Sequence, residues 1–178
     1  MAEAVSLAFA FGLPPEQALE YFRRKGYAIS WDWRGVWQEA QAKAFTVAKA
    51  MRVDILQDIR AAVDRAIAQG ETFETFQRQL EPVLKSKGWW GRQMIVDSDG
   101  VAQMAQLGSP WRLRTIFDTN LQTAYMAGRY QALMENVSDR PYWMYVAVMD
   151  GRTRPAHAAL NGKVFRADDA FWRHFYPP

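Results

Sequence analysis

The chain has 178 residues, a length at which one domain or two small ones can bury a sizeable core. Hydrophobic residues make up 49% and aromatic residues 14%, which argues against extended disorder, and the lack of cysteine excludes disulfides and thiolate chemistry. The net charge of +3 is spread evenly, with 12 basic against 11 acidic residues up to residue 88 and 10 against 8 after it, so no basic block indicates a dedicated nucleic-acid binder. The uncharged stretch 4–15 is too short to span a bilayer and follows no basic region, so we expect a soluble intracellular protein without a signal peptide or a membrane helix.

Residues 1–88 show the periodicity of one-sided helices. A short helix is expected between Pro14-Pro15 and Gly26, and a second helix is capped by Asp32. Apolar residues then recur at three- and four-residue intervals before Gly70 and again after a Thr72 cap. The apolar positions of the four helices are Leu19 and Phe22; Trp33, Val36, Trp37, Ala40, Ala44 and Val47; Leu56, Ile59, Val63 and Ile67; and Phe73, Phe76, Leu80 and Leu84.

Residues 89–108 are predicted to connect the helical module to the second half of the chain. The polar run 97–100 lies between two apolar segments, which indicates a small hairpin or an exposed loop. Ser109-Pro110 then starts the longest helix of the second half. Its expected buried side consists of Leu113, Ile116, Phe117, Leu121, Ala124, Gly128 and Leu133.

The segment Tyr142–Met149 has the aromatic and β-branched content of a strand. Both of its faces are largely apolar, so we expect an interior strand. Asp150-Gly151 ends the strand, Thr153 is expected to cap the short helix that Pro155 opens, and Asn161-Gly162 turns the chain into a further strand. The segment therefore predicts strand, short helix, turn and strand.

Residues 150–165, which read DGRTRPAHAALNGKVF, resemble the signature of the phage Mu F-like head morphogenesis family, the minor capsid proteins of tailed phages and prophages. The resemblance extends back through 119–130 and forward through 168–178, and more loosely to 13–16 and 31–33.

This resemblance and the periodicity together predict an α+β, mainly α fold in three parts. These are a helical docking module over 1–88, a connecting loop or hairpin over 89–108, and a Mu F-like domain over 109–178. We expect that domain to be truncated at its C-terminus, because family members commonly continue past the Pro-Pro into a segment with a Cys-Xaa-Cys. Any metal binding by those cysteines together with His157 would lie outside this sequence.

The resemblance implies a phage or prophage minor head protein that acts in capsid assembly and is not an enzyme. Its implied partners are the portal and other capsid proteins, with at most weak non-specific contact to DNA, and no cofactor, metal or membrane. Its implied location is the virion, in the head interior or portal region, and the bacterial cytoplasm during assembly. The docking aromatics expected from the helical module and the connection are Trp31, Trp33, Trp37, Trp89 and Trp90.

The polar residues of the motif form the candidate site, read as a structural or interaction cluster. For Asp150, a role in the turn is favoured over catalysis. Arg152 and Arg154 are expected to pair with carboxylates in preference to binding phosphate. For His157, a hydrogen-bonded structural role is favoured over acid-base chemistry. Asn120, on the apolar side of the long helix, is expected to bond to the strand and turn segment. The candidate residues are Asn120, Arg129, Asp150, Arg152, Thr153, His157, Asn161 and Gly162.

An enzymatic alternative remains open at this point. Asp150, Arg152, Thr153 and His157 could form a toxin-like nuclease or hydrolase site. Against it, the sequence has no Gly-rich phosphate loop, no histidine pair at metal spacing, no thiol and no nucleophile elbow.

Overall fold

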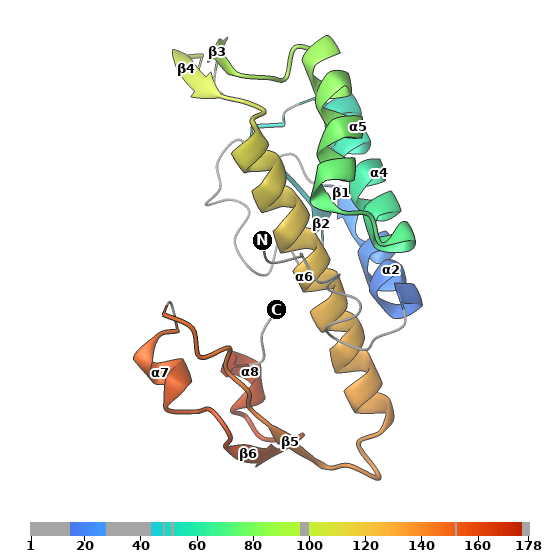
Figure 1. The fold of residues 1–178 in the computed structure, drawn as a ribbon, viewed down its shortest axis with the longest axis vertical. Helices are drawn as coiled ribbons and strands as arrows, with labels where there is room; N and C mark the ends of the chain where they lie inside the picture. The colour runs from blue at the N-terminus through green and yellow to red at the C-terminus, as the bar shows by residue number, and fades with distance from the viewer. Residues whose placement is uncertain are drawn as a thin grey trace. The chain divides into compact units, whose positions relative to one another are not determined.

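The computed structural model describes residues 15–27, 44–47, 49–50, 52–96, 100–151 and 153–175 (Figure 1). They form helices and small two-stranded sheets, which confirms the predicted α+β, mainly α class. The chain divides into two compact units, a first unit of residues 1–128 and a second unit of residues 129–178.

The helices of the first unit follow the predicted apolar periodicity. They are α2 (Pro15–Arg24), α4 (Val53–Gln69), α5 (Phe73–Ser86) and the first part of α6 (Pro110–Glu135). The Thr72 cap is confirmed, since the Thr75 N–H donates to the Thr72 hydroxyl at 3.4 Å. The stripes expected on α4 and α5 are buried at Leu56, Ile59, Val63, Ile67, Phe76, Leu80 and Leu84.

One hydrophobic core joins these four helices. The ring of Phe117 on α6 lies 5.8 Å from that of Phe73 and 5.1 Å from that of Phe76, both on α5. Gly128 allows α6 to approach α2 closely, because a Cβ atom there would lie 3.1 Å from the backbone nitrogen of Ala18. Each helix thus buries its apolar stripe against the others.

The helix predicted to begin at Asp32 is wrong at its C-terminal end. Its positions up to residue 43 lie outside the described residues, but Ala44–Phe45 form strand β2, which pairs in parallel with β1 (Gly26–Tyr27). Phe45 is buried and meets the ring of Phe22 edge-on at 5.6 Å. Apolar spacing alone did not distinguish this buried strand from a helix.

The predicted hairpin is present in the connection. Strands β3 (Arg92–Val96) and β4 (Ala102–Gln106) pair antiparallel, and residues 97–99 between them lie outside the described residues. Ile95 packs against the core and Ala105 is buried, whereas Met94 and Met104, which are register partners, are more than half exposed. The hairpin therefore has one covered face and one open apolar face.

The boundary between the two compact units differs from the boundaries predicted between the three parts of the chain. The sequence set the connection at 89–108, whereas the units divide between Gly128 and Arg129, inside α6. The reason is that the early turns of α6, including Leu113 and Phe117, share the core of α4 and α5. The functional division into a docking module and a Mu F-like domain stays a prediction.

The second unit contains β5 (Tyr142–Met144), α7 (Pro155–Ala158), β6 (Val164–Arg166) and α8 (Trp172–Phe175), with β5 and β6 antiparallel. The expectation of an interior strand over 142–149 is wrong. The assigned strand ends at Met144, and the whole face carrying Tyr142, Met144, Val146 and Val148 is exposed. Only one face of this two-stranded ribbon is covered. That face carries Trp143 and Tyr145, which are buried.

An aromatic cluster lies on the covered face of this ribbon. Trp143 contacts Tyr130 at a centroid distance of 6.0 Å and Trp172 at 5.6 Å. The rings of Phe165 and Phe171 stack at 3.9 Å, and Phe171 also meets Tyr145 at 5.8 Å. Ring-to-ring contacts thus link β5, β6 and the start of α8.

Candidate functional site

The turn after the strand segment is closed by Asp150 and Thr153. The Asp150 N–H donates to the Thr153 hydroxyl at 3.1 Å, and that hydroxyl donates to the Asp150 carboxylate at 3.1 Å. The Thr153 N–H also donates to the Asp150 carbonyl at 3.1 Å. Thr153 therefore does not cap α7 as predicted, because its hydroxyl is engaged in the turn and the residue in the cap position is Arg154.

His157 on α7 is bonded to the strand segment through Tyr145. The Tyr145 hydroxyl and His157 Nδ1 lie 2.6 Å apart, and the two rings stack at 6.2 Å with an interplanar angle of 19°. Tyr145 is buried on the covered face of the ribbon, and His157 is half-buried. The bond fixes the histidine ring against the aromatic cluster.

The Asn161-Gly162 turn is tied to the same strand segment. The Ala147 N–H donates to Asn161 Oδ1 at 2.9 Å, and the Gly162 N–H donates to the Tyr145 carbonyl at 2.8 Å. Gly162 has a φ of +79°, which an L side chain adopts only with strain. The amide of Asn161 thus continues the pairing beyond the last assigned residue of β5.

The other candidate residues lie on α6 or outside the described residues. Asn120 donates to the carbonyl of Ile116 in its own helix at 2.8 Å, and its expected bond to the strand and turn segment stays a prediction. Arg129 is an exposed residue of α6, and Arg152 lies outside the described residues. The structure therefore groups Asp150 with Thr153, and His157 with Tyr145. Tyr145 was not among the candidate residues predicted from the sequence.

Asp168 and Asp169, two of the carboxylates with which Arg152 or Arg154 could pair, accept hydrogen bonds from other residues, and the pairing of Arg152 stays a prediction because that residue lies outside the described ones. Arg166 binds both oxygens of Asp168 at 3.0 and 2.9 Å, and the resulting hydrogen bond raises the pKa of the Arg166 guanidinium. Asp169 accepts from the Phe171 N–H at 2.8 Å. A short-range Arg-x-Asp spacing could have indicated the first of these pairs.

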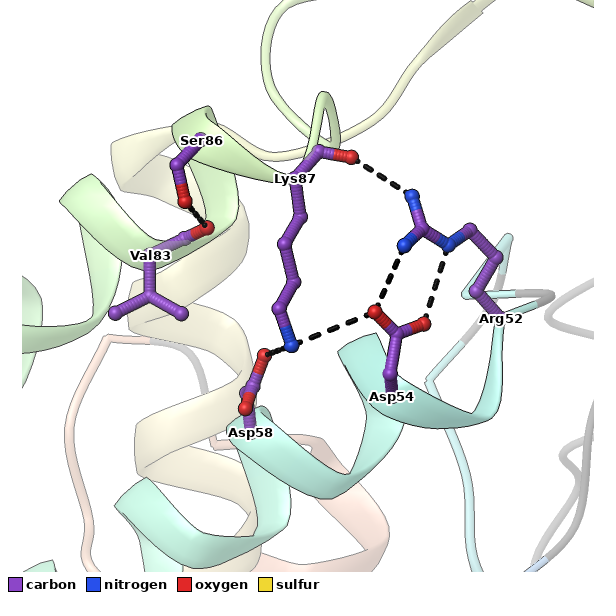
Figure 2. A network of polar contacts seen from close by, with 6 residues as sticks. All are labelled: Arg52, Asp54, Asp58, Val83, Ser86 and Lys87. Atoms are coloured by element: carbon purple, nitrogen blue, oxygen red, sulfur yellow. Dashed lines mark hydrogen bonds and ion pairs between the residues drawn. The ribbon is translucent and has the colours of Figure 1, made fainter.

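Figure 2 shows a polar network in the first unit that sequence reasoning missed. Arg52 binds the two oxygens of Asp54 at 3.1 and 2.8 Å and donates to the Lys87 carbonyl at 2.9 Å, while the Lys87 ammonium pairs with Asp58. Loss of water opposes the charged form of Asp54, but hydrogen bonds from Arg52 and Lys87 outweigh it and lower the pKa of that carboxyl. The network ties the start of α4 to the end of α5, and the four-residue spacing of Asp54 and Asp58 was its signal in the sequence.

A pocket of about 300 Å³ lies beside this network, with Lys49, Arg52, Lys87 and Trp89 in its lining. The Trp89 Nε1–H donates to the Lys49 carbonyl at 3.0 Å. Arg52 and Lys87 are both paired with carboxylates of α4, so their charges are compensated within the network. In the described part of the chain, no three His, Cys, Asp or Glu side chains are grouped so that they could hold a metal ion.

The expected docking aromatics do not form a surface among the described residues. Trp31, Trp33 and Trp37 lie outside those residues. Trp89 is only 3% exposed and belongs to the core of the first unit, and Trp90 is partly buried against that core. The tryptophan that sequence reasoning missed is Trp111, which is 75% exposed because it lies off the buried stripe of α6.

The comparisons with known proteins agree with the residue pattern. The family model described as phage Mu protein F like protein matches residues 57–178. The protein named capsid assembly protein F in Escherichia phage Mu is 53% identical over 176 residues, which cover 99% of this chain and 40% of that protein. The Mu-like prophage FluMu F protein of Haemophilus influenzae is 51% identical over 150 residues, which cover 84% of this chain and 35% of that protein.

The chain therefore spans well under half the length of these two relatives. No solved structure matches it, and none of the described helices is long and apolar enough to cross a membrane. A family model that covers most of the chain and two relatives above 50% identity lead to one assignment. The chain belongs to the phage Mu protein F like family.

Proposed function

We propose that this chain is part of a minor head protein of a phage or prophage, that it acts in capsid assembly without enzymatic activity, and that it docks on the portal or the inner capsid. The family supports the head-assembly role, since one relative is named a capsid assembly protein. On this proposal the protein is present in the virion and, during assembly, in the bacterial cytoplasm.

The open face of the β3–β4 hairpin carries the docking part of the proposal. Met94, Val96 and Met104 are each more than half exposed, and we call these three residues the hairpin face. The hairpin is tied to the first unit on its other side through Ile95 and through backbone bonds between Gly91 and residues 107–108. An apolar patch held rigidly in this way is typical of a protein interface.

The motif geometry supports a structural role over the nuclease or hydrolase alternative. The Asp150 carboxylate and the Thr153 hydroxyl bond to each other, and His157 Nδ1 is taken by the buried Tyr145. These side chains hold turns together, as expected in an assembly protein.

Contact with DNA is proposed to be weak and non-specific. The basic and acidic residues are nearly balanced along the chain. Arginines that could meet phosphate, such as Arg52 and Arg166, are paired with carboxylates at short distances. Binding through other, dispersed cations would fall steeply as salt rises, because it depends on counterion release.

The test measures binding of the chain to the cognate portal protein and, separately, to duplex DNA between about 50 and 200 mM salt. We expect a portal complex that resists salt and is weakened at least tenfold when Met94 and Met104 are both changed to Lys. The matched control is Val83→Lys, an exposed apolar residue on α5 outside the hairpin face. Salt-resistant DNA binding without portal binding, or equal loss in the control, would overturn the proposal.

A further inference from the structure

The pocket at the start of α4 has an apolar floor. Ile55, Trp89 and Leu107 are 2%, 3% and 5% exposed, and the only polar atom of the Trp89 side chain is already used, since its Nε1–H donates to the Lys49 carbonyl at 3.0 Å. At about 300 Å³, the pocket lies at the lower end of the range for ligand sites, so it suits one apolar group of side-chain size. The apolar residues of its lining are Ile55, Trp89, Ile95, Val96 and Leu107.

The charged residues of the lining, in the part of the chain that the structure describes, are all cations. They are Lys49, Arg52 and Lys87. Asp54 and Asp58 balance Arg52 and Lys87, as Figure 2 shows. Lys49 is half-buried, and no carboxylate among the described residues pairs with it. The pocket therefore carries the uncompensated positive charge of Lys49.

The backbone of Lys49 is held in an unfavourable conformation. Its φ of +63° lies in the left-handed region, which residues other than glycine adopt rarely. The hydrogen bond from Trp89 to its carbonyl fixes this turn against the pocket. Residues held in such conformations cluster at active sites and ligand-binding segments. A lysine at a position that glycine would occupy without strain favours a role for its side chain.

We infer that the pocket binds an apolar side chain joined to a carboxylate, presented by a peptide segment of a partner protein. The apolar floor takes the side chain, and the flexible stem of Lys49 brings its ammonium to the carboxylate. A singly charged carboxylate matches one uncompensated cation better than a phosphate does. The guanidinium fork of Arg52, which would suit a phosphate, is occupied by both oxygens of Asp54.

This inference rests on the proposed docking role and names the chemistry of the docked segment. Val96 lines the pocket and also belongs to the hairpin face. A protein that covers the hairpin face therefore passes beside the pocket. This continuity favours a segment of the docked protein over a free small molecule as the occupant.

The first test titrates the full chain with small probes that carry one or both parts of this ligand. N-acetyl-leucine has the apolar side chain and the carboxylate, N-acetyl-leucinamide lacks the charge, and acetate lacks the side chain. We expect N-acetyl-leucine to shift the NMR signals of the lining residues and to bind about threefold more tightly than the amide. Acetate should bind at least about tenfold more weakly than N-acetyl-leucine. Equal affinities for the acid and the amide, or shifts away from the lining, would overturn the inference.

Two variants show whether the charge that selects the acid is that of Lys49. Lys49→Gln should bind the acid and the amide equally. The matched control Lys163→Gln makes the same change at an exposed residue of the second unit and should keep the preference for the acid. Lys49→Gly should lose the preference too, and should unfold at the same or a higher temperature, because glycine adopts a positive φ without strain. A preference for the acid that persists in both Lys49 variants would refute the assigned role of the ammonium.

The second test measures binding to the cognate portal protein and separates this inference from the docking proposal. Lys49→Gln should weaken the portal complex about threefold, and excess N-acetyl-leucine should compete with the portal protein. If only the change of Met94 and Met104 to Lys weakens the complex, the inference fails and the docking proposal stands. If the chain does not bind portal protein but prefers the acid probe, the docking proposal fails and the ligand chemistry of the pocket stands.

Discussion

The two units of this protein are held together by different means. The first unit buries aliphatic side chains such as Leu56, Ile59 and Val63 completely, in one core shared by four helices. Among the described residues of the second unit, only Trp143 and Tyr145 are buried. That unit relies on ring contacts and on hydrogen bonds at its turns.

This difference gives the polar residues of the second unit a structural role. A unit of about 50 residues buries too little apolar surface to fix its turns by packing alone. Side chains such as Asp150, Thr153 and Asn161 then define the chain path through specific bonds. The motif is therefore interpreted as the framework of the small unit.

The largest effect is expected from truncating the aliphatic core. Ile59→Ala removes a fully buried side chain from α4 and should lower the free energy of unfolding by about 2–5 kcal/mol, through lost burial and a residual cavity. The matched control is Val53→Ala at the exposed start of the same helix, where the change should stay within about 0.5 kcal/mol. Denaturant unfolding measures both values, and similar values would break the contrast.

An intermediate, pH-dependent effect is expected from Lys25 in the first unit. Lys25 is 6% exposed, its ammonium lies 4.9 Å above the ring of Tyr21, and burial lowers its pKa from 10.5 to about 8. Between these two values the unfolded chain binds more protons than the folded chain, so this group makes stability rise with pH. Below pH 8 both states are protonated, and the full cost of the buried charge is present.

Lys25→Met removes that cost. At pH 7 the variant should exceed the wild type in stability by about 2–3 kcal/mol, and the advantage should shrink as pH rises from 8 toward 10.5. Parallel denaturant titrations at several pH values give the difference, in which titrating groups remote from Lys25 cancel. A difference that does not change with pH would show that Lys25 is not titrating in that range.

The sequence predicted the helices well because one-sided burial leaves a clear periodicity. Val53–Gln69 and Phe73–Ser86 lie where the apolar spacing, Gly70 and the Thr72 cap placed them. The unit boundary at Gly128 could not be predicted, since a helix that continues through it carries no break in its pattern. What changes at that point is the set of neighbours, which only the structure shows.

Apolar content was a poor guide to burial around Tyr142–Met149. Both faces are apolar, yet one packs on the aromatic cluster and the other is exposed. A residue pattern reports which surfaces avoid water and does not say whether the same chain or a partner covers them. The pairing of His157 with Tyr145 was likewise hidden, because twelve residues and a turn separate them.

The smallest effect is expected from the Tyr145–His157 hydrogen bond in the second unit. Tyr145→Phe keeps the buried ring and deletes the hydroxyl, which should cost about 0.5–1.5 kcal/mol. His157→Ala should cost about 1–3 kcal/mol, because it also leaves the buried hydroxyl without this partner. The control is Tyr142→Phe, which makes the same deletion on the exposed face and should have little effect.

A double-mutant cycle shows whether the two side chains act on each other. If the bond holds α7 to the strand segment, the losses should be less than additive, and hydrogen exchange should rise in residues 142–165 while the first-unit helices stay protected. Additive losses would mean that the 2.6 Å contact contributes nothing to stability. A hydrolase or nuclease activity that disappears in His157→Ala at unchanged stability would restore the enzymatic alternative, because a general base can be removed without loosening the fold.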